Sequence, residues 1–350
     1  MPKFSSHFSN KLIAWYLENK RSMPWRTTTD PYRIWLSEII LQQTRVEQGL
    51  PYYLKFIKTF PNVHALAKAE EELVLKLWQG LGYYSRARNL HACAKYIVTE
   101  LDGKFPETYA SLLKLKGVGD YTASAIGSIS FNLPTAVVDG NVYRVLSRIY
   151  GIKTPINSSA GTKEFKALAQ ELIDPQRPAD FNQAIMEYGA IQCKPKNPNC
   201  LHCIFNNHCV ALQKNSIQEL PVKINKTKIR KRYFHYLVLR SPQGSTVLKQ
   251  RTQKGIWQGL YEFPLIAFDN EVLRFRESAA FLDATKAFQI NHVTLYNDQP
   301  IIHKLSHQHL STFFWIIDVE TITEHMIPWS TIQDYPVPVL ISNFIDTFDF

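Results

Sequence analysis

The chain has 350 residues, enough for two domains of ordinary size that each bury a core, and its 45% hydrophobic content predicts folded globules. A formal net charge of +10, with a pI near 9.2, favours a polyanionic partner because lysines and arginines release counterions from phosphates, although charge alone does not separate DNA, RNA and anionic membrane. No apolar run approaches the roughly 18–20 residues that span a bilayer, so we expect a soluble, unsecreted chain located in the cytoplasm.

From Phe4 to about Val210 the sequence reads as successive amphipathic helices separated by short glycine or proline breaks. Asp30 followed by Pro31 predicts an N-cap and a first-turn proline for a helix that runs through IWLSEIILQQT. Another helix is expected to begin near Pro106 and to stop at Lys116-Gly117. The N-terminal part should therefore be all α.

The segment LLKLKGVGDYTASAIGSI predicts a helix end, a tight turn at Gly117-Val118-Gly119 and a second helix with small residues on one face. It resembles the helix-hairpin-helix of DNA repair proteins. A side chain at Gly117 or Gly119 would keep a phosphate away from the backbone N–H groups at the second helix's N-terminus. Such a hairpin holds the DNA backbone without reading sequence. An ordinary helix–helix corner is the alternative for a lone GVG, and the longer match LKGVGDYTA favours the hairpin.

Four of the five cysteines follow the spacing CX6CX2CX5C, namely Cys193, Cys200, Cys203 and Cys209. Four thiolates so close in sequence predict a metal centre in a reducing compartment, either one zinc ion or one iron–sulfur cubane, and spacing alone does not choose. Lys194 and Lys196 lie in the intervening loop, where we expect them to face phosphates. Cys93 lies on a separate helical stretch and is expected to be a small buried hydrophobe.

Residues 214–232 are rich in lysine and arginine without apolar periodicity, which predicts a linker. Beyond it, YFHYLVLR, STVLKQR and STFFWIIDV are expected strands, whereas RFRESAAFLDATKAF is expected to be helical. The predicted organisation is an all-α domain over 1–225, which includes the cysteine segment, followed by an α+β domain over 233–350.

With the hairpin and the cysteines in one chain, residues 1–225 resemble the helix-hairpin-helix DNA glycosylases of the endonuclease III superfamily, whose cysteine loop holds a [4Fe-4S] cluster. The resemblance therefore favours iron–sulfur, with zinc as the runner-up. PWR, SEIILQQTRV, GLGYYSRARNL, VVDGNVYRVLSR and FNQAIMEYGAIQC resemble the adenine DNA glycosylases of the MutY family in particular. This implies a monomeric base excision repair enzyme that acts on double-stranded DNA with adenine opposite 8-oxoguanine or guanine, and no membrane partner.

Glu38 lies four residues after Ile34 and three after Trp35, so it shares the apolar face of its helix, where desolvation raises the pKa of a carboxyl group. The resemblance implies that Glu38 protonates adenine at N7 and later activates the water or alcohol that attacks the sugar. On helix spacing alone, a solvated surface glutamate is an equal alternative.

Asp139 follows the apolar run PTAVV and precedes a helix, which predicts an N-cap. By similarity to the family's VDGNV segment, Asp139 also faces the sugar and stabilises an oxocarbenium-like state or bonds to it transiently. Asn141 then orients Asp139 or the water. Tyr121 occupies the hairpin position that carries a lysine in bifunctional relatives. A phenol cannot form their Schiff base, so we expect base release that leaves an abasic site, with Tyr121 packed near the sugar.

Flipping a base out of the duplex costs a few kcal/mol and leaves a gap in the stack. The resemblance implies wedge residues that fill the gap and further residues that contact the adenine: Gln42, Gln43 and Tyr83 for the wedge, and Trp25, Arg26 and Gln183 for the adenine pocket. The ordinary alternatives are a core position for Trp25, a surface ion pair for Arg26 and a solvated helix face for Gln183.

KGIWQGLYEFP resembles the Nudix-like C-terminal domain of the same family. A working Nudix hydrolase needs a REXXEE helix to hold Mg2+, which RFRESAAFLDATKAF lacks, so we expect a lesion reader. The family reads 8-oxoguanine with a Phe-Ser-His loop, and here Leu305, Ser306 and His307 stand in that place. Leucine removes an aromatic wall, which leaves the strength of the lesion preference open. The alternative is a solvated strand carrying alternating histidines, His303, His307 and His309.

Three rival functions fit the sequence less well than this prediction. A bifunctional pyrimidine-lesion glycosylase of the endonuclease III type is disfavoured by Tyr121 and by the extra domain. A noncatalytic protein that binds damaged DNA is disfavoured by Glu38 and Asp139 at their family positions. A stand-alone Nudix hydrolase is disfavoured by the missing metal helix.

Overall fold

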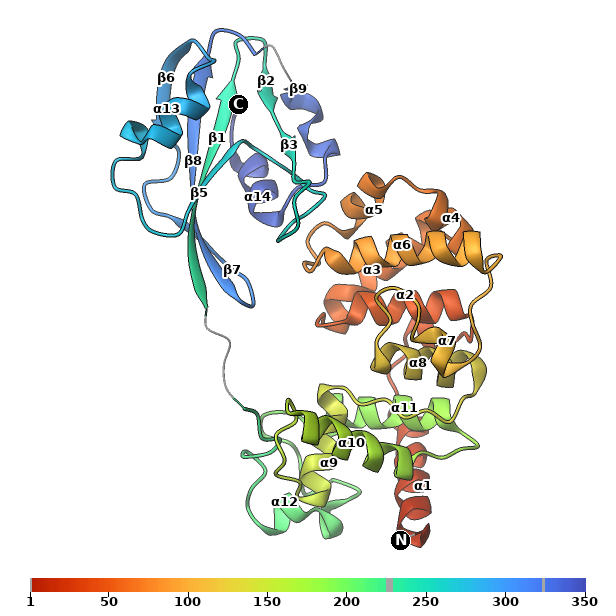
Figure 1. Cartoon of the computed structure of the whole chain (residues 1–350). Helices are drawn as coiled ribbons and strands as arrows, with labels where there is room; N and C mark the ends of the chain where they lie inside the picture. The colour runs from red at the N-terminus through yellow and green to blue at the C-terminus, as the bar shows by residue number, and fades with distance from the viewer. Residues whose placement is uncertain (1, 225–228, 323–324) are drawn as a thin grey trace. The chain divides into compact units, whose positions relative to one another are not determined.

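The computed structural model describes residues 2–224, 229–322 and 325–350, with side chains from His7 onward (Figure 1). It separates into two compact units, Met1–Lys68 with Asn89–Asn225, and Ala69–Arg88 with Lys226–Phe350. Ala69–Arg88 thus groups with the C-terminal residues although it lies within the range 1–225 expected for the first domain. The expected linker at 214–232 falls partly on residues 225–228, outside the described residues.

The first unit is helical over its described residues, as the sequence predicts. The N-cap of α2 is confirmed, because the Asp30 side chain accepts a hydrogen bond from the Tyr32 N–H at 3.0 Å. No described helix in the chain has the length and apolar content to cross a membrane. The helices of this unit are α1 (Pro2–Asn19), α2 (Pro31–Leu41), α3 (Val46–Thr59), α4 (Val63–Lys68), α6 (Ser85–Glu100, which starts in the other unit), α7 (Tyr109–Leu112), α8 (Asp120–Phe131), α9 (Gly140–Tyr150), α10 (Ser159–Leu172), α11 (Pro178–Glu187) and α12 (Val210–Gln213).

The helix hairpin is present, but its first helix is shorter than expected. It starts after Thr108, whose side chain caps the Ser111 N–H, and α7 ends at Leu112 rather than continuing to Lys116. A turn then leads to Gly117, whose φ of +81° lies in the left-handed region that favours glycine. A Cβ there would also lie 2.9 Å from the Cβ of Asn89. The turn ends at Gly119, which is the N-cap of α8.

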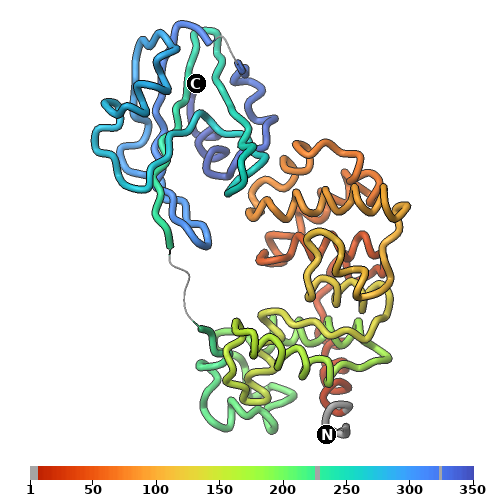
Figure 2. The backbone as a smooth tube through the Cα atoms, in the orientation of Figure 1, coloured from red at the N-terminus to blue at the C-terminus, as the bar shows by residue number. Residues whose placement is uncertain are grey.

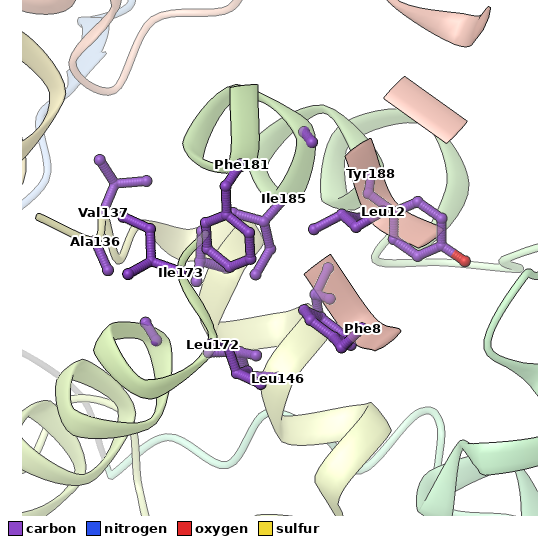
Figure 3. Close-up of a cluster of buried hydrophobic side chains, with 14 of the residues drawn as sticks. Phe8, Leu12, Ala136, Val137, Leu146, Leu172, Ile173, Phe181, Ile185 and Tyr188 are labelled. Carbon is purple, nitrogen blue, oxygen red and sulfur yellow. The ribbon is translucent and has the colours of Figure 1, made fainter. Parts of the chain in front are cut away.

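The main core of this unit joins α1 to segments more than 120 residues away in the sequence. Phe8 and Leu12 of α1 pack with Leu146 of α9 and with Phe181 and Ile185 of α11 (Figure 3). The tube in Figure 2 shows the N-terminal helix running against α11. Each such side chain, fully buried, stabilises the fold by roughly 1.5–3 kcal/mol. Packing against α1 therefore stabilises the positions of α9 and α11.

One buried amide fixes the segment that leads into α9. Asn182 of α11 is fully buried, and its side-chain oxygen accepts from the Val137 N–H at 3.0 Å. Its nitrogen donates to the Ser128 Oγ at 2.9 Å and to the Thr135 carbonyl at 2.8 Å. The extended segment before Asp139 belongs to no helix or sheet, so the Asn182 side chain provides hydrogen-bond partners for its buried backbone groups.

The second unit is built on a mixed sheet with the strand order β5-β1-β8-β6, and β7 pairs with β8. β1 and β8 run parallel, with Arg230 opposite Gln308 and Arg240 opposite Asp318, and the other pairs are antiparallel. Two small ribbons, β2-β9 and β3-β4, accompany it. The bounds are β1 (Arg230–Arg240), β2 (Ser245–Val247), β3 (Lys249–Gln250), β4 (Tyr261–Glu262), β5 (Leu265–Phe268), β6 (Ile290–Leu295), β7 (Ile301–Lys304), β8 (Gln308–Val319) and β9 (Met326–Pro328), with helices α5 (Glu71–Trp78), α13 (Ala279–Thr285) and α14 (Val339–Thr347).

Side chains along β8 point alternately to the two faces of the sheet, and a helix packs on each face. Ile317 belongs to a core cluster with Phe281 of α13. Phe314 faces the other way and stacks on Phe344 of α14, with ring centroids 4.2 Å apart. The expected strands and the expected helix are confirmed, although the helical segment is divided between a 3-10 turn at Phe275–Glu277 and α13.

Replacing Asn182 by alanine should lower the free energy of unfolding by about 2–3 kcal/mol, because the Val137 N–H and the Thr135 carbonyl lose their partner in the interior. Denaturant unfolding of the whole chain measures the change. Asn19→Ala is the matched control and should change stability little, because Asn19 is exposed and its amide donates to the Trp15 carbonyl at 2.8 Å on the surface of α1. Equal losses in both variants would contradict the role given to Asn182.

Candidate active site

A cavity of about 450 Å³ in the first unit brings together residues from Arg21 to Pro195, which are 174 positions apart in the sequence. Its lining comes from α2, the N-termini of α8 and α9, α11 and the 3-10 turn Pro24–Arg26. Seven of the residues singled out from the sequence line it: Trp25, Arg26, Glu38, Tyr121, Asp139, Asn141 and Gln183. The two carboxyl groups expected to act together therefore share one cleft.

Glu38 reaches the cavity from the last turns of α2, where its side chain is 9% exposed. Burial raises its pKa to about 7, and the nearby charge of Asp139 acts in the same direction. A hydrogen bond with the Tyr121 hydroxyl and the charge of Arg26 oppose this rise in pKa. Tyr121 also lies with its hydroxyl 3.2 Å from the Met186 Sδ. Glu38 can therefore hold or release a proton near neutral pH.

Asp139 is the N-cap of α9, as the sequence predicts. One carboxylate oxygen accepts the Asn141 and Val142 N–H groups at 2.9 and 2.8 Å, and the other accepts the Asn141 side-chain amide at 2.8 Å. Burial raises the pKa of Asp139 above its ordinary value, and the lowering effect of these hydrogen bonds and of the charge of Arg144 offsets this only in part. The carboxyl group is thus fixed in direction and surrounded by donors that favour its ionised form.

Arg144 was not predicted, and it holds Asn141 in place from the next turn of α9. Its guanidinium donates to the Asn141 side-chain oxygen at 2.8 Å, to the Gly189 carbonyl at 2.7 Å and to the Cys193 carbonyl at 2.8 Å. One arginine therefore connects the pair Asp139–Asn141 with the start of the cysteine segment.

Glu187 is a second residue that sequence reasoning missed. Arg21 and Arg26 both bind it in a two-pronged geometry, with N···O distances of 2.8–3.1 Å. Burial by itself raises the pKa of Glu187, but the hydrogen bonds from the two arginines outweigh burial and bring it to about 2. Arg26 is therefore held by an ion pair at the cavity wall. Glu187 lies one helical turn after Gln183, a spacing that could have indicated it.

Gln183 faces the same cavity from α11. Its side-chain oxygen accepts a hydrogen bond from the Tyr16 hydroxyl at 3.1 Å. Tyr16 is a core residue of α1 and was not singled out from the sequence. With its oxygen engaged in this way, Gln183 is oriented to present the amide nitrogen as a donor.

The cysteine segment lies directly after α11. Cys193 ends a π-helical turn, Tyr188–Gln192, and Cys209 is the N-cap of α12. All four thiols of the segment are free, and burial raises the pKa of Cys193, Cys200 and Cys209, with a smaller contribution from Cys203. Among the described residues, no group of three or more histidine, cysteine, aspartate or glutamate side chains has the arrangement of a preformed metal site.

Arg148 of α9 is 2% exposed and organises the same segment. It donates to the carbonyl oxygens of Leu220, Lys194 and Pro195 at 3.1, 2.7 and 3.1 Å, and one guanidinium nitrogen lies 3.5 Å from the Cys193 sulfur. Of these four partners only the sulfur can carry negative charge. A buried cation is stabilised by a compensating anion, and Cys193 would supply one if a bound metal deprotonated its thiol.

Four of the five residues expected to meet the DNA backbone are exposed, namely Gly117, Gly119, Lys194 and Lys196, whereas the Val118 side chain is buried at 6% exposure and only its backbone can face a phosphate. Gly119 is exposed, and a Cβ built on it would have nothing within 4 Å, so the N-terminus of α8 is open. Lys194 and Lys196 are exposed on the cysteine segment. The positions of these groups fit the approach of phosphates to backbone N–H groups and to lysines.

The three expected wedge residues fall into different units. Gln42 and Gln43 follow α2 in the first unit, where the Gln42 amide donates to the Thr122 hydroxyl at 3.2 Å. Tyr83 belongs to the second unit and is 47% exposed. Gln43 and Tyr83 both have positive φ, +56° and +48°, which is uncommon for residues with side chains.

The expected reader loop contributes to a separate cavity of about 380 Å³ within the second unit, lined by Tyr83, Trp257, Leu305, Ser306 and His307 among others. The loop is the turn between β7 and β8. The Ser306 hydroxyl lies 3.3 Å from the Nδ1 of His307, and both side chains are exposed.

Comparisons with known proteins agree with this arrangement. Residues 36–175 match the HhH-GPD superfamily of base excision DNA repair proteins, and residues 235–347 match the NUDIX domain. The chain is 35% identical over 301 residues to the adenine DNA glycosylase of Buchnera aphidicola subsp. Baizongia pistaciae (strain Bp), an alignment that covers 86% of this chain and 83% of that one.

More distant organisms and solved structures extend the comparison. The chain is 43% identical over 222 residues to the adenine DNA glycosylase of Homo sapiens, which covers 61% of this chain but only 41% of the human protein. Among solved structures, a thermostable thymine-DNA glycosylase superposes with a TM-score of 0.56 at 29% identity, covering 61% of this chain and 98% of that one.

Proposed function

The chain belongs to the adenine DNA glycosylases of the MutY family, and on that basis we propose that Glu38 and Asp139 excise adenine from mispairs with 8-oxoguanine or guanine. It is a monofunctional glycosylase of base excision repair. The observation that carries the proposed roles is the shared cavity, in which one carboxyl group has a pKa of about 7 and the other is held by donors. When two carboxyl groups of one site lie in different environments, one can act as the acid while the other stays ionised and stabilises positive charge.

The proposed reaction starts when the flipped adenine enters the cavity. Glu38 gives its proton to N7, and the bond between N9 and C1′ of the sugar breaks with its electron pair leaving on the adenine. The cationic sugar is stabilised by the Asp139 carboxylate, which Asn141 and the helix N-terminus keep in place. Glu38, now ionised, takes the proton of the water that attacks C1′.

The neighbouring side chains fit this sequence of steps. Gln183 presents an amide donor, and Arg26 stands at the wall beside Trp25. Tyr121 offers a hydroxyl where a strand-cleaving enzyme needs an amine, so no Schiff base forms and the product is an abasic site. The cavity also supports catalysis over a purely DNA-binding function, because binding alone does not need a buried carboxyl group with a pKa near neutrality.

We propose that the DNA backbone is held by Gly117-Val118-Gly119 together with Lys194 and Lys196. The open N-terminus of α8 and the exposed lysines support this. Gln42, Gln43 and Tyr83 are proposed to fill the gap left by the flipped base. The proposed setting is a monomer that acts on double-stranded DNA in the cytoplasm.

The four cysteines of the segment are proposed to hold one [4Fe-4S] cluster. The buried Arg148 beside Cys193, the four free thiols and the membership of the family support a negatively charged thiolate site here. Such a cluster would hold the loop that carries Lys194 and Lys196 in one conformation. It takes no part in the proton transfers at Glu38.

Ser306 and His307 are proposed to read the base opposite the adenine. Their side chains are exposed at a turn and line a cavity, so they can donate hydrogen bonds to a base edge without further rearrangement. 8-Oxoguanine differs from guanine by a carbonyl at C8 and a hydrogen on N7, and both are groups that such side chains can distinguish.

Glu38→Gln should retain binding to duplex DNA and abolish adenine release, because an amide has no proton to give at neutral pH. Single-turnover assays with alkali to reveal abasic sites measure release, and the exposed Glu18→Gln is the control. In the unaltered protein, release should fall as pH rises through about 7, where Glu38 loses its proton, and fall again in acid as Asp139 gains one. Unimpaired release by Glu38→Gln removes Glu38 from the mechanism.

Purified chain should contain about four iron and four sulfide per molecule if the cysteines hold a cubane. Cys203→Ala should lose this iron, because one of the four ligands is missing. Cys93→Ala, at the buried cysteine outside the segment, should keep it. Elemental analysis that finds one zinc and no iron in the unaltered protein contradicts the cluster and supports the zinc alternative.

Replacing Ser306 and His307 together by alanine should lower the preference for adenine opposite 8-oxoguanine over adenine opposite guanine by about tenfold, equivalent to one or two hydrogen bonds. The ratio of single-turnover rates on the two duplexes measures the preference. His292→Ala, an exposed histidine of β6, is the control. An unchanged ratio in the double variant refutes the assignment.

A further inference from the structure

We propose that Trp257 is the aromatic wall of the cavity that reads the base opposite the adenine, and that it sets the preference for an oxidised purine. This inference depends on the proposed role of Ser306 and His307. Leu305, which begins the same turn, has no ring to offer, whereas Trp257 lines the same cavity of about 380 Å³. The aromatic face that a flat purine needs therefore comes from another loop.

Trp257 lies in a backbone conformation that bulky residues rarely adopt. Its φ is +59°, and the neighbouring Gly255 and Gly259 also have positive φ values of +150° and +86°. A left-handed tryptophan costs conformational energy, and such residues persist where the surrounding structure fixes them, often at binding sites. The turn thus presents a tryptophan where glycine or asparagine would be easier to accommodate.

Hydrogen bonds from the adjoining strands hold this turn. The Leu260 N–H donates to the Trp257 carbonyl at 3.0 Å, and the Gly259 N–H donates to the Arg251 carbonyl at 2.7 Å. The Arg251 guanidinium donates to the Ile256 carbonyl at 3.2 Å and to the Glu262 carboxylate at 2.5 Å. Glu262 is itself buried and accepts from the Tyr236 hydroxyl at 3.0 Å. The position of the indole is therefore fixed before any ligand binds.

The indole also packs directly against the strand that leads into the reader turn. Its ring centroid lies 5.6 Å from that of His303 on β7, and 6.3 Å from that of Phe234 in an edge-on arrangement. Trp257 is 8% exposed, so only the part that lines the cavity remains open. A ring held against β7 two residues before Leu305 is placed to contact a base that Ser306 and His307 bind.

The remaining side of the cavity comes from Ala69–Arg88, which belongs to the same compact unit. Tyr83 and Tyr84 line it, and the Arg88 guanidinium donates to the Gln258 carbonyl at 2.5 Å, next to Trp257 in sequence. The cavity volume falls in the range of small-molecule pockets, which are mostly apolar with a few polar groups. An indole, two phenols and the pair Ser306–His307 are such a lining.

The test compares single-turnover rates of adenine release from duplexes with adenine opposite 8-oxoguanine and opposite guanine. Trp257→Leu should lower the ratio of the two rates about tenfold, the loss expected when a base loses an aromatic partner. Trp257→Phe should keep most of the ratio, and adding Leu305→Phe to Trp257→Leu should restore much of it. Trp329→Leu is the matched control, because Trp329 packs on Phe263 in the same unit and does not line the cavity.

The outcomes separate this inference from the proposed function. If the double variant Ser306→Ala, His307→Ala lowers the ratio and Trp257→Leu does not, the reader turn stands and the role of Trp257 is overturned. If neither lowers it, the proposed reader fails as well. A fall of equal size in Trp329→Leu, or in Trp257→Phe, attributes the effect to general loss of packing and also overturns the inference.

Discussion

The hydrogen bonds at the start of α9 connect the fold of the first unit to its chemistry. Asp139 caps the helix through the Asn141 and Val142 N–H groups, and the same carboxyl group faces the cavity that contains Glu38. Because a capping carboxylate is fixed in position by the helix it begins, its direction is set by the packing of α9 against α1 and α11. Arg144 and Arg148, one and two turns later on α9, then order the cysteine segment. A substitution that displaces α9 would therefore displace both Asp139 and the cysteine segment.

Glu187 and Glu38 line the same cavity, but their pKa values are shifted in opposite directions. Glu187 is surrounded by the guanidinium groups of Arg21 and Arg26, which bring its pKa to about 2 despite its burial. Glu38 has a hydrogen bond with the Tyr121 hydroxyl where Glu187 has two guanidinium groups, and burial raises the pKa of Glu38 to about 7. The first is therefore a permanent anion that positions Arg26, and the second can exchange a proton near neutral pH. The difference comes from a few hydrogen bonds, since both are glutamates on helices of the same unit.

The second unit matches the NUDIX domain but lacks the residues that a Nudix hydrolase needs to hold Mg2+. Its mixed sheet has helical layers on both faces, yet its helical segment at 275–285 carries no REXXEE sequence. The cavity that contains Ser306 and His307 is formed mainly by loops next to strands, where backbone strain is tolerated because the sheet holds the flanking residues. The inclusion of Ala69–Arg88 in this unit means that residues from the middle of the glycosylase sequence share in its structure. Tyr83, expected from the sequence as a wedge residue, is among them.

The sequence by itself determined the features that depend on neighbours within a few residues. The Asp30 cap, the tight turn at Gly117, the strands of the sheet and the spacing of the cysteines could be predicted, because caps, turns and periodicity are local. Resemblance to a family added Glu38, Asp139 and Tyr121. Only the tertiary structure decided which distant groups meet. Glu187 pairs with Arg21 and Arg26 across more than 160 residues, Asn182 holds the segment before Asp139, and Trp257 reaches the cavity of Leu305. Such pairings follow from how helices and loops pack, which no local pattern encodes.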